Sequence, residues 1–338
     1  MRRWTSNEDD AMPIRTILLI LALFVVALAV PIGFKYRSEI RAARLRVSSG
    51  SQVANTPCGS IEYADVGQGP PVLVVHGAAG GFDQGVDIGR PFFVDRGFRV
   101  IAVSRFGYLR TPLPADGSPA AQADVYACLL DTLKLERVGV FGVSAGGPSA
   151  MQFCLRHPER CSALILFAPA TYAPSLARET QPTRPRFLLF LMDATLHSDF
   201  VFWAITKLPR DTLLKAFLGT PPNDFRTATV EEQTGALQAV RHILPISERA
   251  KGMQNDLTVV SSLPRYDLEQ MRVPTLLISA EDDLYGTFRG ARYTAEHVPG
   301  ARFLGFPTGG HLMMGHGNDV AAQMADFLRA HGATRTLK

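Results

Sequence analysis

A serine stands where an apolar strand turns sharply into a helix, and few folds accommodate that arrangement. The run Val138–Val143 is apolar, and Ser144 follows it within the sequence Gly-Val-Ser-Ala-Gly-Gly. A residue that turns a strand directly into a helix adopts a strained backbone, and larger side chains two positions away would obstruct the turn. Gly142 and Gly146 occupy those two positions. The segment therefore predicts a strand, a tight turn that exposes the Ser144 hydroxyl, and a helix.

Short apolar runs alternate along the chain with longer segments of helical periodicity, which is typical of a mostly parallel sheet covered by helices. We therefore predict an α/β fold, and 338 residues with 46% hydrophobic side chains suffice for a sizeable core. The expected strands are residues 72–75, 100–103, 138–143, 163–167, 275–279 and 302–306. The expected helices are residues 120–133, 145–156, 288–297 and 319–331.

The alternation stops between about residues 171 and 263. Apolar and aromatic groups recur there with helical spacing, and no run resembles a strand. The segment is predicted as a helical cap, inserted between two strands and folded over the edge where strands end and ligands bind.

The four cysteines, Cys58, Cys128, Cys154 and Cys161, include no Cys-x-x-Cys pair. Their spread through apolar segments argues against a disulfide framework and against a thiolate zinc site, so we expect buried free thiols. The net charge is +4, and residues 1–46 carry eight basic and four acidic residues, which leaves 27 of each sign in the remainder. Because no basic excess remains there, nucleic acid is not expected as a partner.

Residues 17–34 carry no charge and would span about 27 Å as a helix, which matches the hydrocarbon core of a bilayer. We predict a single-pass transmembrane anchor that binds the membrane. The expected organisation is a tail at 1–16, the anchor at 17–34, a juxtamembrane linker at 35–57 and the main α/β domain at 58–335, with its cap at about 171–263.

Basic residues outnumber acidic ones after the apolar run. Five follow it closely, whereas three precede it, diluted by acidic residues. The side with more basic residues stays in the cytoplasm as a rule, so we expect the main domain to face the cytoplasm. A cleaved signal peptide is the alternative, because Ala27-Leu28-Ala29 has the small-x-small form of a cleavage site, and the domain would then be exported.

A serine hydroxyl becomes a good nucleophile only when a base removes its proton, so a histidine held by a carboxylate must lie elsewhere. Strand 275–279 is followed by Glu281, Asp282 and Asp283, and strand 302–306 is followed by His311. Because parallel strands end at one edge of a sheet, this order of serine, acid and histidine is expected to assemble there. Acyl transfer also needs donors for the developing oxyanion, and we assign them to the backbone N–H groups of Ala78 and Ala145.

Four motifs stand in order along the chain: His-Gly-x-x-Gly-Gly at His76, Ser-Arg-Phe-Gly-Tyr at Ser104–Tyr108, Gly-Val-Ser-Ala-Gly-Gly at Ser144 and Gly-Gly-His at His311. With these motifs the chain resembles the α/β-hydrolase superfamily over residues 59–331, and cap-bearing serine hydrolases of the esterase and lipase type in particular. The resemblance implies an eight-stranded, mainly parallel sheet, a Ser144–His311–Asp283 triad and no cofactor.

One position departs from the family pattern. The acid loop of the family commonly begins with glycine, whereas Ala280 stands at that place here. Counting onward from Ala280 favours Asp283 as the acid, with Asp282 as the alternative and Glu281 in solvent. His316 follows His311 without a standard zinc spacing, so a structural histidine is favoured and no metal site is expected.

These observations predict a serine hydrolase that cleaves a carboxylic ester or a related acyl substrate through an acyl-enzyme. A carbon–carbon bond hydrolase or a perhydrolase with the same triad is an alternative. A non-catalytic, ligand-binding homologue is another. The apolar cap and the nearby bilayer favour a small, hydrophobic acyl substrate, and no oligomeric state is predicted.

Overall fold

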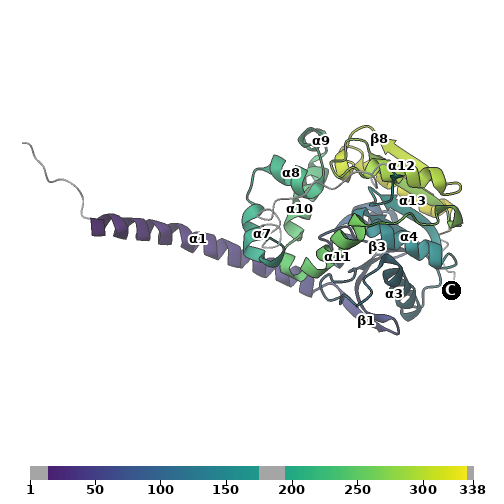
Figure 1. The fold of residues 1–338 in the computed structure, drawn as a ribbon, viewed down its shortest axis with the longest axis horizontal. Helices are drawn as coiled ribbons and strands as arrows, with labels where there is room; N and C mark the ends of the chain where they lie inside the picture. The colour runs from purple at the N-terminus through teal and green to yellow at the C-terminus, as the bar shows by residue number, and fades with distance from the viewer. Residues whose placement is uncertain (1–13, 175–194, 333–338) are drawn as a thin grey trace, which may run out of the picture. The chain divides into compact units, whose positions relative to one another are not determined.

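The computed structural model describes residues 14–174 and 195–332. The chain divides into two compact units, Met1–Ala42 and Ala43–Lys338. Helix α1, Ile14–Ser48, runs from the first unit into the second and includes residues 35–48 of the expected linker (Figure 1). Its most apolar window has a mean hydropathy of 3.0 and no buried residue. A membrane anchor and a signal sequence both have this length and composition.

The second unit contains an eight-stranded sheet in the order β1-β2-β4-β3-β5-β6-β7-β8. Strands β3 to β8 are parallel to one another, whereas β1 and β2 form an antiparallel hairpin that pairs with β4. All six predicted strands are confirmed, and the hairpin was not anticipated. The strands are β1 Gln52–Thr56, β2 Gly59–Val66, β3 Pro71–Val75, β4 Arg99–Val103, β5 Val138–Val143, β6 Cys161–Phe167, β7 Thr275–Ala280 and β8 Arg302–Phe306.

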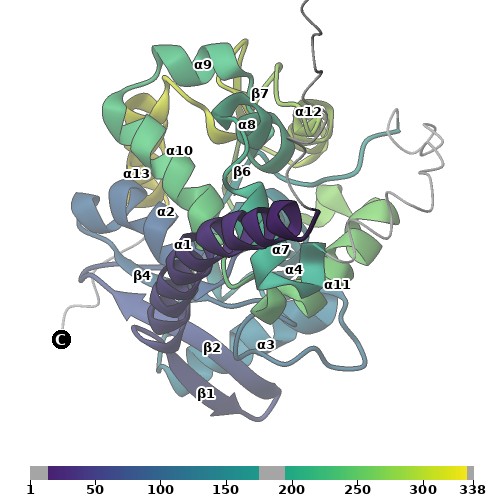
Figure 2. The ribbon, with the colours of Figure 1, turned by 90° about the vertical axis from the view of Figure 1, so that its left-hand side faces the viewer.

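Helices cover both faces of the sheet, and alternate side chains of β3 pack against the helices on opposite faces. Leu73 and Val75 join the core beneath α3, α4 and α12, whereas Val72 and Val74 join the core beneath α2 and α13. Figure 2 shows α2 and α13 on one side of the sheet and α3 and α4 on the other. These helices are α2 Phe82–Phe92, α3 Pro119–Thr132, α4 Gly147–Arg156, α12 Thr287–His297 and α13 Gly317–Ala330.

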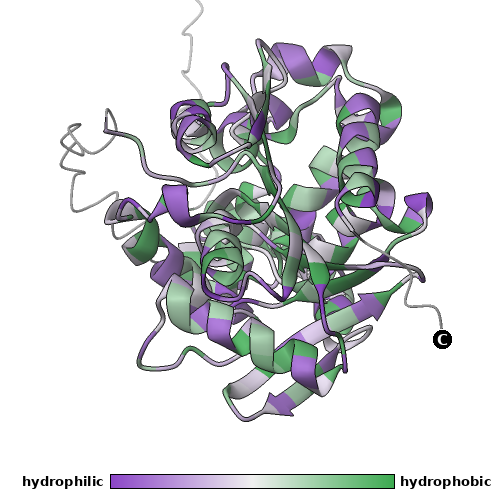
Figure 3. Ribbon diagram, turned by 90° about the vertical axis from the view of Figure 1, so that its right-hand side faces the viewer, coloured by the Kyte–Doolittle hydropathy of each residue, from purple (hydrophilic) through white to green (hydrophobic). Residues whose placement is uncertain are grey.

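A strand buried on both faces is apolar along its whole length, which explains why these strands were predictable from short apolar runs. Figure 3 shows the hydrophobic residues on the central strands and a mixture of polar and apolar residues on the helices around them. The core therefore lies in two layers, one on each face of the sheet.

The described part of the segment between β6 and β7 is helical. Its apolar side chains form a core of their own, which includes Leu214, Phe225 and Val240. Met314, which follows His311 in the chain, belongs to the same core. The insertion therefore packs against the segment that carries His311. The helices in the described part of the insertion are α7 Asp199–Ile205, α8 Arg210–Leu218, α9 Pro222–Thr227, α10 Val230–His242 and α11 Ala250–Ser261.

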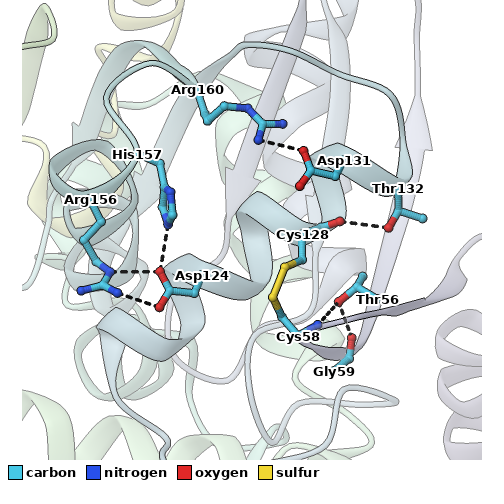
Figure 4. Close-up of a disulfide and its surroundings, with 10 residues drawn as sticks. All are labelled: Thr56, Cys58, Gly59, Asp124, Cys128, Asp131, Thr132, Arg156, His157 and Arg160. Atoms are coloured by element: carbon cyan, nitrogen blue, oxygen red, sulfur yellow. Dashed lines mark hydrogen bonds and ion pairs between the residues drawn. A yellow bond between two sulfur atoms is a disulfide. The ribbon is translucent and has the colours of Figure 1, made fainter.

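The four cysteines form two disulfides, so the expectation of free thiols is wrong. Cys58, in the turn between β1 and β2, is bonded to Cys128 of α3 (Figure 4). Cys154 of α4 is bonded to Cys161 at the start of β6. The Cα atoms are 6.1 Å and 5.3 Å apart, within the range for disulfides. The first pair lies 70 residues apart in sequence, and only the fold brings it together.

Candidate active site

Ser144 stands directly after β5, at the edge of the sheet where the parallel strands end. Its φ angle of 50° lies in the left-handed region, and it begins the short 3-10 helix η2, Ser144–Gly146, that leads into α4. A Cβ atom on Gly142 would lie 2.6 Å from the Cβ atom of Ala150, and one on Gly146 would lie 2.4 Å from the carbonyl oxygen of His76. Both glycines are therefore required by the close packing of the turn.

His311 and Asp283 are in direct contact. His311 lies in the 3-10 helix η5, Gly310–Leu312, after β8, and its Nδ1 is 2.8 Å from Oδ2 of Asp283, in the loop after β7. Both side chains are buried. With Nδ1–H donating to the carboxylate, Nε2 is left to accept a proton.

Asp283 is held as a carboxylate by its surroundings. Its Oδ1 accepts a hydrogen bond of 2.9 Å from the N–H of Tyr285, and its Oδ2 accepts one from the hydroxyl of Thr287. Burial alone would raise the pKa of Asp283, but the hydrogen bond and the charge of His311, together with these donors, lower it. The carboxylate therefore stays charged and can orient the imidazole ring.

Asp282 contacts the backbone of the histidine loop rather than the imidazole. Its Oδ1 accepts a hydrogen bond of 2.8 Å from the N–H of Gly310. Asp224 of α9 accepts one of 3.1 Å from the neighbouring Gly309, and burial and a hydrogen bond with Asp282 raise the pKa of Asp224 to about 6. Two carboxyl groups thus hold the loop of His311, and no sequence motif marks Asp224.

Gly219, at the end of α8, joins the loops that carry the histidine and the acid. Its carbonyl oxygen accepts hydrogen bonds of 3.2 Å from His311 N–H and 2.9 Å from Leu284 N–H. The ring of Tyr285 packs edge-to-face on the imidazole of His311, with 4.8 Å between centroids. Through these contacts the insertion fixes the loop that carries His311 and the loop that carries Asp283. Among the described residues, the Ser144 hydroxyl makes no hydrogen bond, so the structure joins His311 to Asp283 by a hydrogen bond but not to Ser144.

The loop His76–Gly81 follows β3 and reaches the same edge. A Cβ atom on Gly77 would lie 3.2 Å from the Cβ atom of Ser144, so the loop backbone packs against the serine turn. The Ala78 side chain is exposed, and its N–H makes no hydrogen bond within the described parts of the chain. Ala145 lies in the first turn of η2, where N–H groups have no partner within the helix. Within the described residues, neither of these two N–H groups donates a hydrogen bond.

His76 is neutral, and its ring stabilises the loop His76–Gly81 through hydrogen bonds. Its Nε2 accepts a hydrogen bond of 3.0 Å from the N–H of Arg105, so its Nδ1–H donates to the carbonyl of Gly77 at 2.6 Å. Burial and the charge of Arg105 hold the pKa of His76 well below its usual range. His76 therefore does not compete with His311 as a base.

Arg105 and Asp256 form a buried ion pair beneath the loop. The guanidinium meets the carboxylate in two hydrogen bonds of 2.6 Å and 2.5 Å, and donates a third of 3.1 Å to the carbonyl of Gly77. The Tyr108 hydroxyl donates to Asp256 and accepts from the N–H of Ala79. Ser104–Tyr108 was noted as a family motif, but a lone aspartate on a distant helix carries no signal of its pairing.

No group of three or more His, Cys, Asp or Glu side chains suited to a metal ion occurs in the described ranges. His316, the residue considered for a metal, packs its ring on Phe306 with 4.4 Å between centroids.

Residues 70–316 match a family model described as the alpha/beta hydrolase fold. The uncharacterized hydrolase YcgS of Bacillus subtilis is 26% identical over 263 residues, which cover 75% of this chain and 89% of that protein. The 2-hydroxy-6-oxononadienedioate/2-hydroxy-6-oxononatrienedioate hydrolase of Paraburkholderia phymatum is 29% identical over 283 residues, 79% of this chain and 90% of that protein. A solved alpha/beta hydrolase fold protein from Nakamurella multipartita superposes with a TM-score of 0.65 at 27% identity, covering 83% of this chain and all of that chain.

Proposed function

Because the chain belongs to the α/β-hydrolase fold family, we propose that it is a serine hydrolase that cleaves a carboxylic ester or a related acyl substrate. The observation that carries this proposal is the buried Asp283–His311 hydrogen bond at the sheet edge where Ser144 directly follows β5. A base with a free Nε2 and a serine in a strained turn are the parts that acyl transfer requires.

In the proposed reaction Ser144 Oγ attacks the substrate carbonyl carbon while His311 Nε2 takes its proton. Asp283 stays ionised and stabilises the imidazolium, and the N–H groups of Ala78 and Ala145 stabilise the oxyanion. His311 then protonates the leaving alcohol as the ester bond breaks and an acyl-serine forms. A water molecule, deprotonated by His311, attacks the acyl-serine, releases the acid and restores the serine.

The proposal is tested by covalent labelling with a fluorophosphonate, which reacts with activated serines. We expect one adduct, mapped by mass spectrometry to Ser144, that disappears in Ser144→Ala. Ser262→Ala is the matched control, because Ser262 is exposed and distant in sequence from the site. An unlabelled wild-type protein, under conditions that label a control esterase, would contradict the proposal.

The substrate is proposed to be a small molecule with a hydrophobic acyl group. Support comes from the apolar core of the helical insertion and from an N-terminal helix apolar enough to cross a membrane. Turnover of p-nitrophenyl esters of graded chain length measures the preferred acyl length. A preference for the shortest, most polar esters would contradict a hydrophobic substrate.

A carbon–carbon bond hydrolase is the second candidate. The relative from Paraburkholderia phymatum carries the name of such an enzyme and aligns with 79% of this chain. The same serine, histidine and acid would then act on a ketone, with addition of water across the broken carbon–carbon bond. Incubation with 2-hydroxy-6-oxononadienedioate and product analysis separates the two candidates.

A further inference from the structure

A second buried arginine, Arg249, holds the other end of the loop that would supply the oxyanion donor. Arg249 precedes α11 in the insertion, and its side chain is completely buried. Its Nη1 donates to the carbonyl oxygen of Gly80 and, at 3.1 Å, to Oδ1 of Asp83. Its Nη2 donates to Oδ2 of Asp83 at 2.8 Å and to the carbonyl oxygen of His242 at 3.0 Å.

The loop has little room to move relative to this guanidinium. A Cβ atom on Gly80 would lie 2.5 Å from Nδ1 of His76, and one on Gly81 would lie 2.9 Å from Nη1 of Arg249. The backbone at Gly80 and Gly81 is therefore enclosed between the buried imidazole and the buried guanidinium. Because interiors are close-packed, a displacement of Arg249 must displace the loop backbone that it contacts.

Arg46, in the last turn of α1, binds the same partners as Arg249. Its Nε lies 3.2 Å from Oδ2 of Asp83, and its Nη2 donates to the carbonyl oxygens of His242, at 3.0 Å, and Leu244. Burial would raise the pKa of Asp83, but the two arginines outweigh it and lower that pKa to about 2. Asp83 is thus a charged bridge between Arg46 and Arg249 at any physiological pH.

We propose that Arg249 is a positioning residue for the oxyanion loop, and that Arg46 at the end of the N-terminal helix sets the position of Arg249 through Asp83. The connection runs from Arg46 to Asp83, to Arg249 and to the carbonyl of Gly80. It rests on the proposed hydrolase function, because the loop matters for rate only if Ala78 N–H binds an oxyanion. The end of the apolar helix is then part of the catalytic unit rather than a passive tether.

The kinetic test compares Arg46→Met, Arg249→Met and the double variant, in the full chain, with the p-nitrophenyl ester that the wild type prefers. Since loss of one oxyanion donor lowers kcat by about 10²- to 10³-fold, we expect displacement of the loop to lower kcat by about 10- to 100-fold in Arg249→Met and about threefold to tenfold in Arg46→Met, with KM nearly unchanged. If Arg46 acts only through Arg249, the double variant loses no more than Arg249→Met alone. Independent effects that multiply in the double variant would overturn the proposal.

Arg99→Met is the matched control. Arg99 also forms a two-pronged ion pair, with Asp65, but it stands at the start of β4, whereas the site lies where the strands end. We expect its kcat to equal that of the wild type. A loss of kcat in Arg99→Met as large as in Arg46→Met would mean that any lost ion pair slows the enzyme, and would overturn the proposal.

A second measurement does not depend on turnover. Hydrogen–deuterium exchange of the peptide that covers residues 76–85 should be faster in Arg46→Met than in the wild type and unchanged in Arg99→Met. Unchanged exchange in Arg46→Met overturns the link even if the chain hydrolyses no ester, whereas an absent Ser144 adduct contradicts only the proposed function. Arg46→Met also suffices if Arg249→Met fails to fold, which the loss of a fully buried partner of Asp83 can cause.

Discussion

Two neighbouring aspartates, Asp282 and Asp283, could each have been the acid, and one sequence does not fix the register of their loop. The structure places Asp283 Oδ2 on the imidazole of His311 and Asp282 Oδ1 on the N–H of Gly310. The difference arises because the backbone turn after β7 directs adjacent side chains in different directions. The serine and the histidine were easier to predict, since each stands in a short glycine-containing motif.

The two aspartates are expected to differ in their effect on catalysis. Asp283→Asn should lower kcat by about 10⁴-fold, because the amide no longer holds the imidazole with Nε2 free to accept a proton. Asp282→Asn keeps an oxygen for the N–H of Gly310 and should lower kcat less than about tenfold. Steady-state kinetics on both variants checks this. The reverse order would identify Asp282 as the acid.

Asp224 is expected to make stability depend on pH. The pKa of Asp224 is raised from its ordinary value of 3.8 to about 6, so folding favours the protonated carboxyl. The contact with Asp282 therefore stabilises the fold fully only below about pH 3.8, and this stabilisation is lost as the pH rises from there through about 6. Asp224→Asn stays neutral, so it should unfold at a higher temperature than the wild type at about pH 7.5, by a smaller margin at about pH 5, and at a similar temperature at about pH 3. The gain should be at most a few degrees, because Asp224 is partly exposed.

Thermal unfolding of both proteins across this range measures the effect. Parallel pH profiles for the wild type and Asp224→Asn would show that another group is responsible.

The elements that were missed share a weak apolar pattern. Strand β1 has a single buried residue, Ala54, and pairs at the edge of the sheet, so its sequence lacks the apolar run that marked β3 to β8. Helix α2 contains Gly85, Gly89 and Pro91, which are poor helix formers. The structure explains the glycines, since Cβ atoms at Gly85 and Gly89 would lie 2.8 Å from Ala102 and 2.9 Å from Val100 of β4.

Two glycine-to-alanine changes within helices should have opposite effects. Gly85→Ala forces α2 away from β4 and should destabilise the fold by about 1–3 kcal/mol. Gly235→Ala in α10 has no atom within 4 Å of the new Cβ and should stabilise the fold by about 0.5–1 kcal/mol. Urea unfolding midpoints measure both. Stabilisation by Gly85→Ala would mean that α2 does not pack this closely on the sheet.

Two features of the molecule bear on the compartment of its main domain, and they favour opposite sides of the membrane. The basic residues after the apolar run predict a cytoplasmic domain, but two of them, Arg44 and Arg46, form ion pairs with Asp199 and Asp83 inside the folded unit. The two disulfides favour export, because such bonds persist in oxidising compartments and are rare in the cytoplasm. We therefore expect the domain to be exported, as the alternative of a cleaved signal peptide predicts.

Thiol alkylation of freshly lysed cells tests this expectation. Without reductant none of the four cysteines should react, and after reduction in denaturant all four should. Complete alkylation without reductant, with an exported disulfide protein in the same lysate left unmodified, would place the domain in the cytoplasm.

The buried ion pairs and hydrogen bonds that hold the loop His76–Gly81 could not be predicted from the sequence. Arg105, Asp256 and Arg249 are isolated in the chain, and only the packing of the insertion on the sheet brings them beneath the oxyanion loop. The fold and the tight turn at Ser144 follow from local patterns, whereas the supporting ion pairs depend on the assembled tertiary structure.

The hairpin strand β1, Gln52–Thr56, decides where the molecule tolerates trimming. A polypeptide that started at residue 58 would lack this strand, and β2 would become an unpaired edge strand. Its backbone N–H and C=O groups could then pair with another molecule. A polypeptide that started at Ala43 would keep β1 paired with β2 and would retain Arg46. Whether a shortened enzyme stays soluble or aggregates thus depends on β1, a short segment whose hydropathy alone would predict a connecting loop.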